Sequence, residues 1–179
     1  MGAITRGFAN NVTTAGKILQ TAVSGGVGST MANQWRITAD FTGAGNPIAS
    51  NWEIADTDGY GSLGSNMTQS SGVFTFPATG IYYIQFIVSN TAANIDGQIQ
   101  IQIETTTDGS SFGGASEQVT GISRASDSNT YSTSFVFDVT NVSTHKCRFV
   151  VASTSSDTTT HGHSSQNETH ATFIRLGDT

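Results

Sequence analysis

The chain has 179 residues, a length that suits one domain, and carries a formal net charge of −6 with 11% charged residues. Its seven basic residues are scattered rather than gathered into a stripe, which predicts no nucleic-acid binding. No apolar run of about 18 residues occurs, so neither a transmembrane helix nor membrane association is expected. Because Cys147 is the single cysteine, no internal disulfide can form, and stability has to come from packing and assembly.

Residues 1–33 differ in composition from the rest of the chain. They are rich in Gly, Ala, Thr and Asn, carry scattered apolar side chains such as Ile4 and Phe8, and include a glycine-rich hinge at 24–28. The first ten residues lack the basic start and apolar core of a signal peptide. We interpret 1–33 as an extended N-terminal anchoring arm and 34–179 as the folded domain.

From Gln34 onward, apolar and polar residues alternate at the period of a β-strand. The clearest case is 98–104, where three isoleucines share one face and amide side chains share the other. Turn residues separate such segments, among them Gly113-Gly114 and 127–129. The predicted strands are 34–42, 51–55, 73–76, 80–91, 97–106, 116–123, 130–139, 145–154 and 168–176. Because no helical pattern separates them, the sequence predicts an all-β fold, an antiparallel jelly-roll sandwich.

The stretch 70–86 carries a recognisable signature. An aromatic residue, five free positions, a glycine and then alternating aromatics are met by Phe74, Gly80, Tyr82 and Phe86. This pattern resembles that of the complement first-component globular head, a relative of the tumour-necrosis-factor jelly roll, and 172–176 is similar to the last strand of that family. The resemblance implies a compact homotrimer in which the flat sheet face of each subunit packs around a threefold axis.

The opening segment 1–14 resembles the start of small virion proteins from tailed phages of marine bacteria, cyanophages especially. That resemblance implies a virion protein made in the cytoplasm of a bacterial host. Our hypothesis is a trimeric capsid decoration or cement protein that binds the major capsid protein, or other virion proteins, through residues 1–33. The alternative is a tail-fibre or appendage domain that recognises a glycan on the host surface.

His161-Gly162-His163 is the main candidate for a metal site. On an extended segment, two imidazoles spaced two residues apart point to the same side, and His161 and His163 from three subunits could share one ion on a threefold axis. His170 is near enough in sequence to join them, whereas His145 is not. The flanking Thr and Ser residues favour the alternative, a solvated loop that binds no metal.

Two further groups have competing interpretations. The segment 56–59, Asp-Thr-Asp-Gly, resembles part of a calcium loop but also suits a turn stabilised by aspartate side chains, which is the interpretation we favour. Trp52, Tyr60 and Tyr131 are typical of a carbohydrate platform, but equally of a core or a trimer seam, and we favour core or seam.

The sequence contains no pattern that predicts catalysis. A Gly-x-Ser-x-Gly elbow is absent, and so is a glycine-rich phosphate loop, so no catalytic residues and no cofactor are expected, and the protein is not predicted to be an enzyme. Cys147 alternates with Phe149 and Val151, which predicts a buried small hydrophobe rather than a nucleophile.

Overall fold

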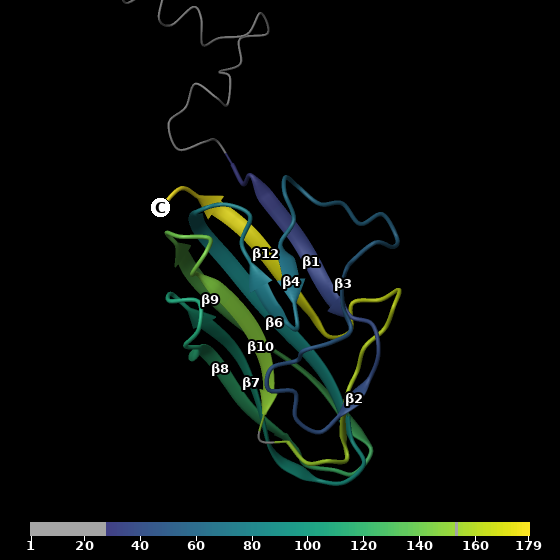
Figure 1. Cartoon of the computed structure of the whole chain (residues 1–179). Helices are drawn as coiled ribbons and strands as arrows, with labels where there is room; N and C mark the ends of the chain where they lie inside the picture. The colour runs from purple at the N-terminus through teal and green to yellow at the C-terminus, as the bar shows by residue number, and fades with distance from the viewer. Residues whose placement is uncertain (1–27, 153) are drawn as a thin grey trace, which may run out of the picture.

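A computed structural model describes residues 28–152 and 154–179, and within them every regular element is a strand (Figure 1). No helix in this part of the chain is long and apolar enough to cross a membrane. The strands are β1 (Met31–Ile37), β2 (Phe41–Thr42), β3 (Trp52–Ile54), β4 (Thr68–Ser70), β5 (Val73–Thr75), β6 (Gly80–Ala92), β7 (Asp96–Thr106), β8 (Gly113–Ile122), β9 (Asp127–Val139), β10 (Lys146–Ala152), β11 (Thr158–Thr160) and β12 (His170–Gly177).

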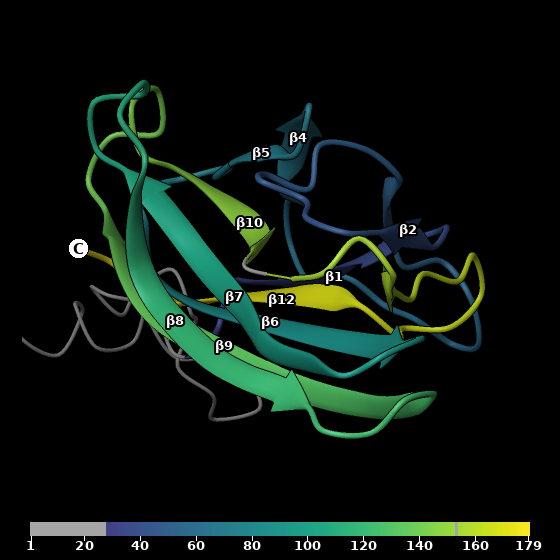
Figure 2. The same ribbon diagram turned by 90° about the horizontal axis from the view of Figure 1, so that it is seen from below.

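The strands form two antiparallel sheets that face each other (Figure 2). The first sheet has the order β2-β11-β6-β12-β1-β3, and β9 pairs along the whole length of β6 on its other side. The second sheet has the order β4-β5-β10-β7-β8. Strands β8 and β9 run beside each other where the two sheets meet, and the Ser116 and Thr133 hydroxyls lie 2.5 Å apart across this seam. Residues distant in sequence are thereby neighbours in both sheets.

The core lies between the sheets and follows from strand alternation. Every second residue of β6 is buried, and Ile99, Ile101 and Ile103 of β7 are fully buried, as the period of two predicts. Phe74 sits at the centre, with the rings of Trp35, Trp52, Phe149 and Phe173 at centroid distances of 5.2–5.4 Å. Edge-to-face packing of this kind adds to the stabilisation that burial alone provides.

The signature at 70–86 connects the two sheets, since β5 belongs to the second sheet and β6 to the first. Phe74, Tyr82 and Phe86 all face the core, while Tyr83 points to the opposite side of β6. Gly80 has a φ of +146°, and a Cβ there would lie 2.5 Å from the backbone oxygen of Gly177, so only glycine fits.

The observed strands correct several sequence predictions. The predicted strand 34–42 is two strands, because the chain turns at 38–40, and β1 begins at Met31, inside the predicted arm. The rest of the predicted arm, residues 1–27, lies outside the described residues. Gly113-Gly114 and 127–129, predicted as turns, open β8 and β9, since the chain reverses earlier, at 107–112 and 124–126.

The largest correction is at Thr158–Thr160, predicted as a solvated loop. These residues form β11, which pairs with β6 and β2, and both Thr158 and Thr160 are fully buried. Their hydroxyls form hydrogen bonds to protein groups instead of to water. Thr158 donates to Asp96 at 2.6 Å, and Thr160 accepts from Asn90 at 2.7 Å. Polar side chains can line a core when every hydrogen bond is met.

Candidate functional site

The outward side of the first sheet carries a row of apolar side chains. Strand register places Ala32, Ile174, Tyr83 and Val136 directly beside one another across β1, β12, β6 and β9. Ile81 lies beside Tyr83 on the same side of β6, and Ile87 follows on that side beyond the polar Gln85. We call these six residues the apolar face. Val136 is 54% exposed and the other five are partly exposed, so this face presents a hydrophobic surface to whatever lies next to it.

The outward side of the second sheet is polar. The amides of Gln100 and Gln102 both donate to Glu117, the latter at 2.6 Å. Arg148 bonds to Glu104 at 2.5 Å, with its guanidinium 4.3 Å from the centre of the Phe112 ring. These polar side chains thus have hydrogen-bond partners within the same chain.

At the end of β1, the outward side of the first sheet carries a buried charge. Arg36 is 1% exposed and donates to Glu53 at 2.7 and 2.9 Å and to Asp56 at 2.5 Å. It also donates to the Thr57 hydroxyl at 3.0 Å and to the carbonyl of Ser164. Burial alone would lower the pKa of Arg36, but hydrogen bonds and charge from the two carboxylates outweigh burial and raise it. The guanidinium thus joins the 53–57 segment to the loop before β12.

A pocket of about 430 Å³ opens beside Arg36. Tyr60 and Gln34 form one wall, where the Tyr60 hydroxyl accepts a hydrogen bond from the Gln34 backbone at 3.2 Å. Asn167 donates to the Gln34 side chain at 3.1 Å from the opposite loop. The pocket is rich in amide and hydroxyl groups, and among the described residues that line it Tyr60 is the aromatic one.

The sequence grouped Tyr60 with Trp52 and Tyr131, and the structure separates them. Trp52 and Tyr131 are core residues, as favoured, and their polar atoms bond to Ile48 O and Asn90 at 2.8 and 2.6 Å. Tyr60 lies in the pocket and is the member of that group still available to a ligand.

The segment 56–59 is part of a turn, as favoured, but Asp56 bonds to Arg36 rather than to the turn itself. Asp58 and Gly59 both have a positive φ, and Tyr60 N donates to Thr57 O at 3.1 Å. The carboxylate of Asp56 pairs with Arg36, so it is already neutralised by a side chain of this chain.

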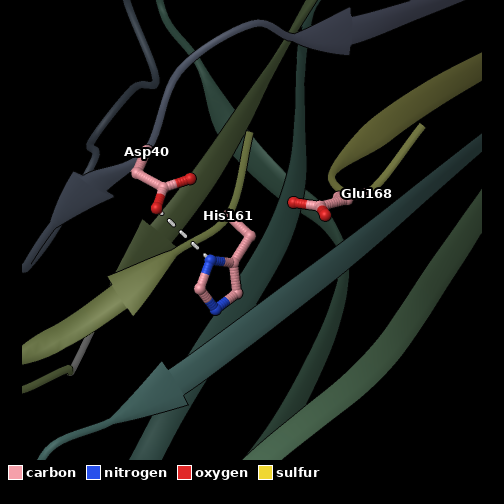
Figure 3. A group of neighbouring side chains, drawn as sticks. All are labelled: Asp40, His161 and Glu168. Atoms are coloured by element: carbon pink, nitrogen blue, oxygen red, sulfur yellow. Dashed lines mark ion pairs between the residues drawn. The ribbon is translucent and has the colours of Figure 1, made fainter. Parts of the chain in front are cut away.

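His161 lies against two carboxylates contributed by distant segments (Figure 3). Asp40 follows β1, His161 follows β11, and Glu168 precedes β12, and one ligand atom from each lies within 4.8 Å of the others. The Nδ1 atom of His161 is 3.4 Å from Oδ2 of Asp40, and its Nε2 atom is 2.7 Å from the Thr91 hydroxyl. A histidine and two carboxylates are a donor set that suits a divalent metal.

The other histidines lie apart from this cluster. His163 is exposed, and its Nδ1 accepts hydrogen bonds from the backbone and hydroxyl of Ser165, both at 3.1 Å. His145 stacks on Phe137, and burial lowers the pKa of His170 despite backbone hydrogen bonds that act in the opposite direction. Within one chain, His161 thus meets Asp40 and Glu168, and the shared ion on a threefold axis stays a prediction.

Cys147 is fully buried between the sheets, as its alternation predicts. Burial raises the pKa of its thiol, so the thiolate that a nucleophile needs is disfavoured.

Comparison with known proteins identifies the fold. No protein-family model and no curated protein match the chain. Among solved structures, murine APRIL at pH 5.0 matches with a TM-score of 0.58 at 11% identity, covering 84% of this chain and 100% of that one. Eiger TNF from S. frugiperda matches with a TM-score of 0.58 at 12% identity, covering 86% and 96%. The domain is therefore an antiparallel jelly roll of the tumour-necrosis-factor type, as the signature at 70–86 implied.

Proposed function

We propose that this protein is a homotrimeric structural module that works by assembly and binding rather than by catalysis. The observation that carries the proposal is the apolar face. Four side chains in lateral register, Ala32, Ile174, Tyr83 and Val136, form an apolar row on the outward side of the first sheet, and we propose that this is the flat sheet face that packs around a threefold axis. Covering this surface with further copies of the chain removes apolar area from water, which is the dominant driving force for association.

We propose further that the trimer is a virion component, a capsid decoration or cement protein, and that it binds the major capsid protein or another virion protein through residues 1–33. The resemblance of segment 1–14 to phage virion proteins supports this role. A trimer that binds only the assembled shell stabilises that shell by mass action, without any chemical step.

Removing residues 1–27 tests the anchoring role without touching the folded domain. The cut has to precede residue 28, because Thr30 already accepts a hydrogen bond from Arg175 at 3.0 Å. By light scattering, we expect the full chain to have about three times the 18.7 kDa mass of one chain. The 28–179 variant should also be a trimer, with a mass lower by that of the removed residues. Only the full chain should co-sediment with capsids. Co-sedimentation of 28–179 at full strength would contradict the anchoring role.

The pocket beside Arg36 favours a second candidate, a tail-fibre or appendage domain that binds a host glycan. Tyr60 offers a ring for the apolar C–H face of a sugar, and Gln34 and Asn167 offer amide groups for its hydroxyls. We would expect the full chain to bind a glycan on an array. Loss of this binding in Tyr60→Ala, but not in Gln102→Ala on the second sheet, would support this candidate. Absence of binding on the array would remove it.

A further inference from the structure

We infer that Asp40, His161 and Glu168 bind one divalent transition-metal ion per chain. The ion would be held within a single subunit, by atoms from three separate segments.

The geometry of the cluster is close to that of a bound ion. Around a tetrahedral ion with bonds of about 2.0–2.1 Å, neighbouring ligand atoms lie about 3.4 Å apart. Nδ1 of His161 and Oδ2 of Asp40 are separated by 3.4 Å, and one ligand atom from each of the three residues lies within 4.8 Å of the others, so a small inward movement of the side chains would complete the site. The same 3.4 Å is longer than an ordinary N–H···O hydrogen bond of about 2.7–3.2 Å, so this contact is a weak substitute for a bond.

A second, independent feature is that hydrogen bonds from neighbouring groups orient the ligand side chains. Nε2 of His161 lies 2.7 Å from the Thr91 hydroxyl, which in turn lies 2.6 Å from the Ser128 hydroxyl. If Nε2 carries the proton and donates to Thr91, Nδ1 presents its lone pair toward Asp40. Metal-binding histidines are oriented in this way by a hydrogen bond from their other ring nitrogen.

Asp40 is oriented in the same manner. Its Oδ1 accepts a hydrogen bond from the backbone of Gly162 at 2.9 Å, which leaves Oδ2 turned toward His161. A Cβ on Gly162 would lie 2.5 Å from the carbonyl oxygen of Ala39, so only glycine allows the two segments to approach this closely. The close approach brings the His161 imidazole to the carboxylate.

The charge of the cluster calls for a cation. Two carboxylates converge on one imidazole, and in residues 28–152 and 154–179 no lysine or arginine forms an ion pair with Asp40 or Glu168. The Glu168 carboxylate has no hydrogen-bond partner in the same part of the chain. A doubly charged ion would neutralise both carboxylates and join the segments before β2, after β11 and before β12.

The donor set favours a first-row transition metal over calcium. Imidazole nitrogen suits Zn²⁺ and its neighbours, whereas Ca²⁺ takes six to eight oxygen ligands, more than this cluster offers. Three protein ligands would leave one position of a tetrahedral ion for water.

The test is a calorimetric titration of the full chain with Zn²⁺, after treatment with a chelator and dialysis. We expect saturation at one ion per chain, unchanged by excess Ca²⁺. Asp40→Asn, His161→Gln and Glu168→Gln should each weaken binding at least tenfold, and Thr91→Val, which acts through His161, by about 10–100-fold. Melting curves without metal check that each variant is folded.

His163→Gln is the matched control, because it changes an exposed histidine two residues from His161. We expect its affinity for Zn²⁺ to equal that of the parent chain. An equal loss in His163→Gln, or saturation at one ion per three chains, would overturn the site in favour of an ion shared between subunits. No saturable binding by the parent chain would overturn it outright.

Discussion

The outward sides of the two sheets differ although both belong to strands that alternate with the same period. In the second sheet, Gln102 and Arg148 turn outward and bond to acids of the same chain. In the first sheet, Tyr83 and Val136 turn outward instead. Apart from the tyrosine hydroxyl, both side chains are apolar. The outward side chains of Gln102 and Arg148 thus find partners within one chain, although Val119 on the same side is 49% exposed, whereas the first sheet exposes a lateral row of apolar side chains.

The side of the domain on which we expect assembly is therefore determined by the outward residues and not by the core. The core of a sandwich has to be apolar whatever the protein does, so Phe74 and its neighbours identify the fold alone. A sheet that faces only water favours polar residues at its outward positions, and a row of apolar residues there marks a contact.

Arg36 is a buried charged residue on the outward side of the first sheet, and its loss should have the largest effect on stability. Arg36→Met removes hydrogen bonds to Glu53, Asp56 and Thr57, and we expect the free energy of unfolding to fall by about 3 kcal/mol. Urea denaturation measures the change. A loss below about 1 kcal/mol would mean that the 53–57 segment is held by its other contacts.

Asp96 joins the two sheets, since it opens β7 and accepts hydrogen bonds from Thr154, Ser155 and Thr158. Burial alone would raise its pKa, but these hydrogen bonds outweigh burial and hold the pKa below the ordinary value of 3.8. Asp96→Asn should lower the free energy of unfolding at neutral pH by about 1–2 kcal/mol, because an amide cannot accept all of these bonds.

The same aspartate predicts part of the acid sensitivity. The folded carboxylate binds a proton more weakly than the unfolded one, so its contribution to stability is fully present above pH 3.8. That contribution is lost as the pH falls through the lower pKa of the folded state. Melting temperatures between pH 5 and 2 should fall less steeply in Asp96→Asn than in the parent, and parallel curves would contradict this assignment.

Arg148 is the counterpart of Arg36 on the second sheet, and its loss should have the smallest effect. Its pair with Glu104 is a single, partly buried ion pair, with the two side chains 24% and 13% exposed, and we expect its loss to cost about 1 kcal/mol. Arg148→Met should therefore change the free energy of unfolding by that amount in urea denaturation. A loss of stability as large as that of Arg36→Met would mean that the polar outward side of the second sheet stabilises the fold as strongly as the buried Arg36 does.

Strand alternation made most of the fold predictable from the sequence. The isoleucines of β7 and the aromatic residues of 70–86 alternate with polar residues in the sequence, and the structure buries the same residues between the sheets. The strand at Thr158–Thr160 was not predictable. Its burial depends on residues of other strands, since Asp96 accepts a hydrogen bond from Thr158 and Asn90 donates one to Thr160. Threonine is common in strands and loops alike, so local composition could not distinguish the two.

The candidate site was less predictable, for the same physical reason. His161 was singled out as a metal ligand, but the sequence paired it with His163, its neighbour along the chain. The fold instead places it beside Asp40 and Glu168, through the contact of Gly162 with the backbone at Ala39. The apolar face likewise appears only when strand register sets Ile174, Tyr83 and Val136 side by side.

The most direct test of the account compares two valines on opposite sheets. Val136, on the apolar face, is 54% exposed, and Val119, on the outward side of the second sheet, is 49% exposed. Light scattering should give about three times 18.7 kDa for the parent chain and for Val119→Lys, and a monomer of 18.7 kDa for Val136→Lys. A parent chain that is monomeric, or a Val136→Lys trimer as stable as the parent, would contradict assembly through the apolar face.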